Sequence, residues 1–381
     1  MIDWSKSMKQ TYEFYTVNPN TGMNKTKLYN VTGASVSRDL NSDTQVSGSI
    51  EYDGELDEEY VRIYLIAEQG NERENVPLIT MLCQTPSTSY DGKRKNTSIT
   101  GYSPLLELQN VYPPFGYTIP KYPKNGLADN DPLILNNLIP ELCKANMRTQ
   151  VLDITENLKQ VNANRLAQPF VTDPQNTWFE VINTLVGMTD YMFRVTPLGV
   201  TYFGKRPKIK QMAPIWTFDS QNSSILYSDI SIDRDLYGIP NVIEVITTST
   251  AGTTLTAVVS NDDSNSPTST VSRGRKVVKR IVNPEDLGKL PSNSDGSVLQ
   301  QYAQNILEKA NELEYKISYK HGYCGVDIGD CVYINYPDAG LNFVKALVVS
   351  QKIDCKTGCQ VEETAVFTKR LYDGGKVNAS N

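Results

Sequence analysis

The sequence predicts a mostly β fold of the α+β class, in which helix–hairpin modules are set between regions of short strands. Three observations support this prediction. Residues 10–110 contain short segments rich in β-branched and aromatic residues, separated by clusters of Gly, Asn and Asp. Residues 177–186 and 298–313 carry apolar residues at three- and four-residue spacing, the period of an amphipathic helix. Strand-like sequence follows each of them, so helices and strands are mixed along the chain.

Residues 1–110 are predicted to be an N-terminal β-barrel-like domain. The expected strands are residues 12–16, 27–31, 45–52, 60–66 and 76–83, and a hairpin turn at residues 90–96 leads into a return strand at residues 97–102. Their spacing is close to the ~8 to 12 residues typical of an antiparallel sandwich or barrel.

Residues 111–205 are predicted to combine a linker with a helix–hairpin α+β module. Prolines within residues 112–123 exclude a regular helix and an inner strand, so this segment is expected to be a linker or a surface arm. Thr177 is expected to cap a helix that ends at Gly187, just before a hairpin over residues 191–203.

An earlier helix of the same module is expected to begin with Asp131 as its cap and Pro132 in its first turn. Its expected buried stripe comprises Ile134, Leu135, Leu138, Ile139, Leu142 and Cys143. Because proline lacks a backbone N–H, Pro140 is expected to kink this helix or to end it early.

Residues 206–295 are predicted to be a β-domain with a polar insertion loop. Strands at residues 241–246 and 253–259 flank a turn, and the loop at residues 261–272 is expected to be too polar for a core. The run that follows, residues 273–280, has five positive charges in eight residues. Without aromatic stacking partners, it is more typical of a solvated or subunit-facing edge strand than of a nucleic-acid platform.

Residues 296–381 are predicted to be a helix followed by C-terminal strands. Ser297 and Gln300 indicate a capping box at the start of this helix, whose apolar stripe runs from Val298 to Leu313. Gly329 is expected to bend the chain between two extended pieces. Strands at residues 344–350 and 360–367 bracket a turn, and residues 373–381 are expected to be a loose tail.

Charge and hydropathy exclude several classes of protein. The chain of 381 residues has 37 basic and 43 acidic residues, so its net charge of -6 does not indicate a nucleic-acid-binding surface. No apolar run approaches the ~18 residues of a membrane span, and the first residues lack the pattern of a signal peptide. Six scattered cysteines indicate free thiols made in a reducing compartment rather than a disulfide scaffold.

Few residues are candidates for catalysis. His321 is the single histidine, no nucleophile signature accompanies it, and a structural role is expected for it. The sequence has no phosphate loop, dinucleotide fingerprint or nucleophile elbow. Adjacent carboxylates such as Glu362 and Glu363 are expected on a solvated face. We therefore predict no catalytic residues and no cofactor.

Four cysteines near the C-terminus are the only metal candidates that we single out. Cys324, Cys331, Cys355 and Cys359 would supply the four thiolates of a tetrahedral zinc site if two hairpins brought them together. Their spacings, with six and three residues between the members of each pair, depart from the common pattern. Buried or cross-strand thiols are therefore expected in place of a metal site.

The order of these elements resembles the hub proteins of phage tails and related contractile injection particles, especially those from phages of Gram-positive bacteria. The likeness rests on residues 97–106, residues 177–203, residues 241–245, residues 265–275, and residues 299–313 preceding residues 326–333. Each motif alone is a turn or an amphipathic helix, so the specificity lies in their order and spacing, which span most of the chain.

The resemblance implies a homotrimer with two tube-like antiparallel β-barrel domains per subunit, the second completed by the strands of residues 296–381. Such a trimer joins a hexameric tail tube to a trimeric spike or tip and forms a channel for tape-measure protein and DNA, without specific DNA binding. Its partners would be tail tube, distal tail or baseplate, spike and tape-measure proteins, in a virion assembled in the bacterial cytoplasm. Two alternatives stay open: a peptidoglycan hydrolase of the tail tip and a host-binding adhesin.

Overall fold

The computed structural model describes residues 2–92, 94–121, 133–154, 166, 168–221, 225–284 and 296–372. The chain folds as two compact units, of which the first comprises residues 1–230 and 318–365 and the second residues 231–317 and 366–381. It passes from one unit to the other within β13 (Leu226–Arg234), β17 (Glu312–Gly322) and β20 (Gln360–Arg370). The four-part division expected from the sequence stays a prediction.

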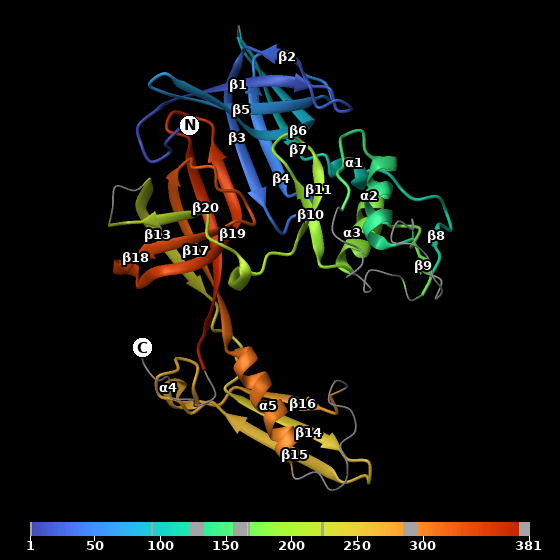
Figure 1. The fold of residues 1–381 in the computed structure, drawn as a ribbon, viewed down its shortest axis with the longest axis vertical. Helices are drawn as coiled ribbons and strands as arrows, with labels where there is room; N and C mark the ends of the chain where they lie inside the picture. Colours follow the sequence, from blue (N-terminus) through green and yellow to red (C-terminus); the bar gives the residue numbers. More distant parts are fainter. Residues whose placement is uncertain are drawn as a thin grey trace. The chain divides into compact units, whose positions relative to one another are not determined.

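The predicted mostly β fold is confirmed, because 47% of the described residues are in strands and 15% are in helices. The described strands form no closed barrel. Thirteen of them build one large sheet with the order β13-β17-β20-β19-β3-β4-β7-β6-β5-β1-β2. Strand β18 also pairs with β19 (Figure 1), and β12 pairs with β18. Segments from both ends of the sequence therefore lie side by side, since β19 pairs with β3.

The other strands of this sheet come from three stretches of the chain. They are β1 (Lys9–Val17), β2 (Asn24–Leu28), β3 (Val31–Asp39), β4 (Val46–Tyr52), β5 (Tyr60–Gln69), β6 (Glu72–Asp91), β7 (Arg94–Tyr102), β12 (Trp216–Asp219), β18 (Cys331–Tyr336) and β19 (Leu341–Asp354). The strand predicted at residues 27–31 was wrong, since that segment contains the end of β2 and the start of β3. The rest of β3 was missed because small and polar residues fill it, so no apolar alternation marks it.

A helical module follows β7 along the chain. It contains α1 (Leu106–Gln109), β8 (Thr118–Ile119), α2 (Leu135–Asn146), β9 (Phe170–Val171), α3 (Trp178–Gly187) and the hairpin β10 (Tyr191–Val195) and β11 (Thr201–Lys205). The helix cap expected at Thr177 is confirmed, and it is a full capping box, because Thr177 and Glu180 satisfy each other's backbone N–H groups. Phe179 of α3 stacks on Phe193, which in turn contacts Phe203 across the hairpin. The hairpin is therefore packed against the helix that precedes it.

Helix α2 begins later than predicted and does not end early. Asp131 and Pro132 lie outside the described residues, and the helix starts after Ile134. Pro140 lies inside the helix, which continues to Asn146. Its lost hydrogen bond is tolerated because the neighbouring Ile139 and Cys143 are completely buried in the core of the module.

The second unit is built around a three-stranded sheet with the order β15-β14-β16. Its elements are β14 (Val242–Thr248), β15 (Thr254–Ser260), α4 (Thr270–Arg273), β16 (Val278–Val282) and α5 (Ser297–Ala310). Leu299, Ala303 and Leu307 of α5 pack on Ile243 and Val245 of β14. The basic edge strand predicted at residues 273–280 is confirmed only for residues 278–280, which begin the edge strand β16 and pair with β14 in parallel, whereas Arg273 is the last residue of α4. The loose tail predicted at residues 373–381 lies outside the described residues.

The predicted capping box of α5 was wrong. Ser297 is the first helical residue, and the cap is Gly296, which adopts a left-handed conformation with a φ of 79°. Val298 is 49% exposed, and Leu313 belongs to β17 instead of the helix. The stripe is shorter than predicted because the chain turns into a strand directly after Asn311.

The loop at residues 261–272 corrects another prediction, because its polar side chains form part of the core. Asn261, Thr268 and Ser269 are completely buried. Asn261 Nδ2 donates to Ser266 Oγ at 2.9 Å, and Thr268 Oγ1 donates to Asn311 Oδ1 at 2.5 Å. Mutual hydrogen bonds remove the cost of burying these groups, so a polar sequence here forms an internal network.

Candidate functional site

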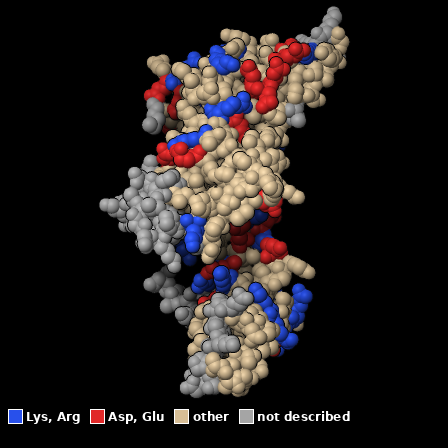
Figure 2. Space-filling model, turned by 90° about the vertical axis from the view of Figure 1, so that its right-hand side faces the viewer, with Lys and Arg blue, Asp and Glu red and all other residues tan. Residues whose placement is uncertain are grey.

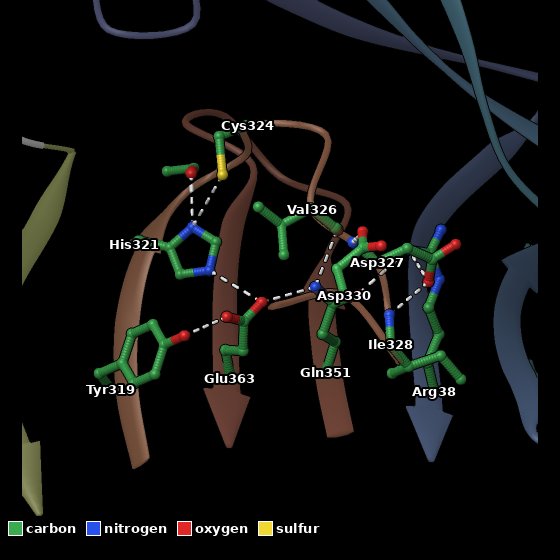
Figure 3. Close-up of polar contacts among 11 residues, drawn as sticks. Arg38, Tyr319, His321, Cys324, Val326, Asp327, Ile328, Asp330, Gln351 and Glu363 are labelled. Atoms are coloured by element: carbon green, nitrogen blue, oxygen red, sulfur yellow. Dashed lines mark hydrogen bonds and ion pairs between the residues drawn. The ribbon is translucent and has the colours of Figure 1, made fainter. Parts of the chain in front are cut away.

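A buried polar network crosses four adjacent strands of the large sheet. Tyr319 and His321 of β17, Glu363 of β20, Gln351 of β19 and Arg38 of β3 point toward one another from the strand order β17-β20-β19-β3 (Figure 3). Each of these five residues is at most 4% exposed. Buried titratable groups occur both at functional sites and in structural networks. The contacts that these residues make show which of the two roles they have.

Glu363 is the central acceptor of this network. Its carboxylate accepts hydrogen bonds from the Tyr319 hydroxyl and from Gln351 Nε2, the latter at 2.6 Å. His321 Nε2 lies 3.4 Å from Glu363 Oε2. Burial, followed by the nearby Glu363 carboxylate, raises the pKa of Tyr319 well above its usual value. The Tyr319 hydroxyl therefore keeps its proton and acts as a permanent donor.

His321 is also placed beside Cys324, in an arrangement that resembles a nucleophile, a base and a carboxylate. The Cys324 sulfur lies 3.9 Å from His321 Nδ1, yet Nδ1 also lies 2.7 Å from the Gly322 carbonyl oxygen. Because a carbonyl oxygen only accepts, Nδ1 carries a proton and cannot remove one from the thiol. Burial also raises the pKa of Cys324. This geometry gives a neutral thiol beside a proton-bearing nitrogen, which is unsuited to nucleophilic catalysis.

Arg38 connects this network to the loop of residues 327–330, which precedes β18. Arg38 Nη1 donates to Gln351 Oε1 and to Asp327 Oδ1, both at 3.1 Å, and Arg38 Nη2 donates to the Leu78 carbonyl oxygen at 2.7 Å. Asp330 accepts from the Asp327 backbone N–H at 2.8 Å, and burial raises its pKa. The guanidinium thus fixes the loop to β3, β19 and β6, which is a positioning role.

The hairpin β10–β11 also contacts this loop. Arg194 of β10 donates through Nη2 to the Ile328 carbonyl oxygen. The bend predicted at Gly329 is confirmed, since this residue has a φ of 82°. A Cβ added to Gly329 would lie 2.1 Å from Arg194 Nη1. The backbone conformation therefore favours glycine here, and a Cβ at this position would also displace the Arg194 guanidinium.

No protein-family model and no curated protein sequence matches the chain. Among solved structures, the tail protein from Neisseria meningitidis aligns over 94% of this chain and 97% of its own, with a TM-score of 0.56 and 12% identity. The 43 kDa tail protein of prophage MuSo2 from Shewanella oneidensis aligns over 93% and 98%, with a TM-score of 0.57 and 12% identity. The chain has the fold of phage tail proteins.

The tail-protein fold is shared with part of a larger assembly. A chain of the Francisella PdpA–VgrG complex aligns over 99% of this chain and 59% of its own, with a TM-score of 0.54 and 8% identity. Within the described part of this tail-protein fold, no helix has both the length and the hydropathy needed to cross a membrane.

The cysteines singled out from the sequence are not gathered into one set in the tail-protein fold. Cys359 lies near Cys355 and contributes to its raised pKa, and the Cys359 thiol interacts with Tyr12. Cys324 lies beside His321, and Cys331 pairs with Leu347 in the sheet. Among the described residues, no three or more His, Cys, Asp or Glu side chains are placed to hold a metal ion. All four thiols are free and buried, and burial raises the pKa of each.

Sequence reasoning missed Glu363, because it expected a solvated face for the pair Glu362 and Glu363. Only Glu362 lies on the surface as expected, and its Oε1 is 3.0 Å from Lys320 Nζ. A usable signal was present in the alternation of β20: Val361 and Ala365, two residues to either side of Glu363, are both buried. Residues at this spacing share one face of a strand, which places Glu363 inside.

Replacing Gly329 by alanine is expected to lower the free energy of unfolding by about 2 to 4 kcal/mol. The left-handed backbone costs a residue with a Cβ ~1 to 2 kcal/mol, and Arg194 must also leave the Ile328 carbonyl. Urea unfolding followed by tryptophan fluorescence measures the change. Gly325→Ala is the matched control, because its φ is 80° and nothing lies within 4 Å of an added Cβ. Equal losses in both variants would show that the Arg194 contact contributes nothing.

Alkaline pH is expected to destabilise the tail-protein fold from about pH 9 upward. Burial raises the pKa of Cys83 from 9.0 to about 12, and that of Cys359 from 9.0 to about 11. Between pH 9 and these values the unfolded chain loses thiol protons that the folded chain keeps, so stability falls as pH rises. Thermal unfolding from pH 8 to 11, compared between the wild type and Cys83→Ala, measures the effect. A wild-type profile no steeper than that of the variant would contradict the contribution of Cys83.

Proposed function

We propose that this protein is a structural hub of a phage tail or baseplate. The observation that carries the proposal is the full-length match to two tail proteins, each covered over at least 97% of its own chain. Because fold alone does not determine function, the proposal also draws on the character of the candidate site. That network is buried, and its hydrogen bonds around Glu363 connect neighbouring strands. Such a network stabilises the sheet, as expected of a protein whose function depends on its surfaces and not on a catalytic site.

In the proposed particle, three copies form a homotrimeric adaptor between the hexameric tail tube and the trimeric spike or tip. Each copy contributes two tube-like β domains, so that three subunits match the six-fold tube. The channel passes tape-measure protein and later DNA, without a specific DNA site. The other partners are distal tail or baseplate proteins, and the protein belongs to the virion after assembly in the bacterial cytoplasm. Closed homo-oligomers of this kind rely on complementary surfaces rather than on a catalytic cleft.

The molar mass in solution tests this proposal most directly. Size-exclusion chromatography with light scattering of the full chain is expected to give three copies, and electron microscopy of the particle is expected to place them around the central conduit. Six symmetric copies at the tip, or a position outside the conduit, would overturn the proposal.

Two functional assays separate the alternative classes. A zymogram on Gram-positive cell walls is expected to show no clearing, whereas clearing would favour a peptidoglycan hydrolase. The isolated protein is expected to associate with tail tube or spike protein and not with host cells. Binding to cells without binding to tail proteins would favour an adhesin.

A further inference from the structure

The segment between β11 and β12 concentrates positive charge. Residues 205–212, which include the short 3-10 helix Ile209–Gln211, contain four basic residues and no carboxylate. Lys205, Arg206 and Lys208 line an open depression of about 410 Å³ together with Arg194 and Asp190. Arg206 and Lys208 are exposed, and neither has an ion-pair partner among the described residues. Like charges held this close repel one another, so a carboxylate-bearing surface that covers them gains energy.

A complementary surface occurs elsewhere in the same unit. The loop between β4 and β5, residues 53–59, has five carboxylates in seven residues. Asp53 and Asp57 are exposed and have no ion-pair partner in the described part of the chain. In the view of Figure 2, uncharged residues make up most of the visible face, and charged side chains form separate groups on it. Concentrated opposite charges of this kind select a partner and fix its register.

We infer that loop 53–59 of one copy docks into the basic depression of residues 194 and 205–208 of the next copy. This inference rests on the proposed homotrimer and adds the interface. Within one copy, Arg206 and Lys208 form no ion pair with Asp53 or Asp57. Because the two surfaces differ, the contact is heterologous, and three copies that each use both surfaces once close a ring. Nucleic acid is a poorer occupant, since the chain carries a net charge of -6.

Charge reversal followed by charge exchange tests the docking. The full chain is prepared as wild type, as Arg206→Glu/Lys208→Glu, as Asp53→Lys/Asp57→Lys, and as the combination of all four changes. Lys316→Glu/Lys352→Glu is the matched control, because it reverses two exposed lysines outside both surfaces. Light scattering gives the mass across a dilution series in 50 mM and 500 mM salt, and circular dichroism verifies the fold of each variant.

Each two-residue reversal is expected to raise the trimer dissociation constant by about tenfold or more, since opposed pairs become like-charged pairs. The combination is expected to restore the trimer, and the control is expected to match the wild type. A trimeric wild type that both reversals leave unchanged, or a combination that stays dissociated, would overturn the interface while leaving the hub role intact. A monomeric wild type would overturn both. Retention of duplex DNA by the wild type, lost on reversing Arg206 and Lys208 at unchanged trimer mass, would assign the depression to nucleic acid.

Discussion

Replacing Glu363 by leucine is expected to lower the free energy of unfolding by about 3 to 5 kcal/mol, the typical cost of breaking a buried charged network by removing one member. Leucine fits the space but accepts no hydrogen bond. The Tyr319 hydroxyl and the Gln351 amide then lose their acceptor inside the sheet, where water does not reach them. Glu363→Gln is expected to cost less, because one oxygen remains. Chemical denaturation followed by circular dichroism measures both variants.

The neighbouring residue supplies the control for this prediction. Glu362→Leu removes a carboxylate from the same strand, where Glu362 and Lys320 are 48% and 40% exposed and pair at the surface. Its expected effect is below about 1 kcal/mol, since exposed ion pairs contribute little. A similar loss in both variants would show that the cost comes from the strand, not from the buried network.

Replacing Asn311 by alanine is expected to destabilise the second unit by about 3 kcal/mol. The Asn311 side chain is completely buried, donates to the carbonyl oxygens of Pro240 at 3.2 Å and Leu307 at 2.8 Å, and accepts from Thr268. Alanine leaves these groups with fewer partners and creates a cavity, and both effects cost energy. Because the chain has two units, thermal unfolding is best combined with amide hydrogen exchange of α5.

Asn305 of α5 is the control for this substitution. It is exposed, and its side chain accepts a hydrogen bond from Gln301 one turn earlier. Alanine is a better helix former than asparagine, so Asn305→Ala is expected to change stability by less than about 0.5 kcal/mol. Faster exchange of α5 amides in Asn311→Ala alone would confirm the role of the buried side chain. Equal exchange in both variants would contradict it.

Signals that extend over a few residues predicted their elements well. The helix cap at Thr177, the hairpin of β10 and β11 and the bend at Gly329 were all predicted and are present. Each of them depends on contacts or backbone preferences within a few positions. The predicted cap at Ser297 was wrong because such a short pattern does not fix the first residue of a helix, and the true helix starts one residue earlier than predicted, with Gly296 as its cap.

The sequence by itself therefore determined the mostly β class, the helix–hairpin module and the absence of recognisable enzyme motifs, because alternation, capping and turn chemistry are local. Only the tertiary structure decided which polar residues lie inside. Arg38 and Gln351 are 313 positions apart, yet they share a hydrogen bond. Burying Glu363 or Asn311 is favourable only when such distant partners are in place, and no local pattern records where those partners are.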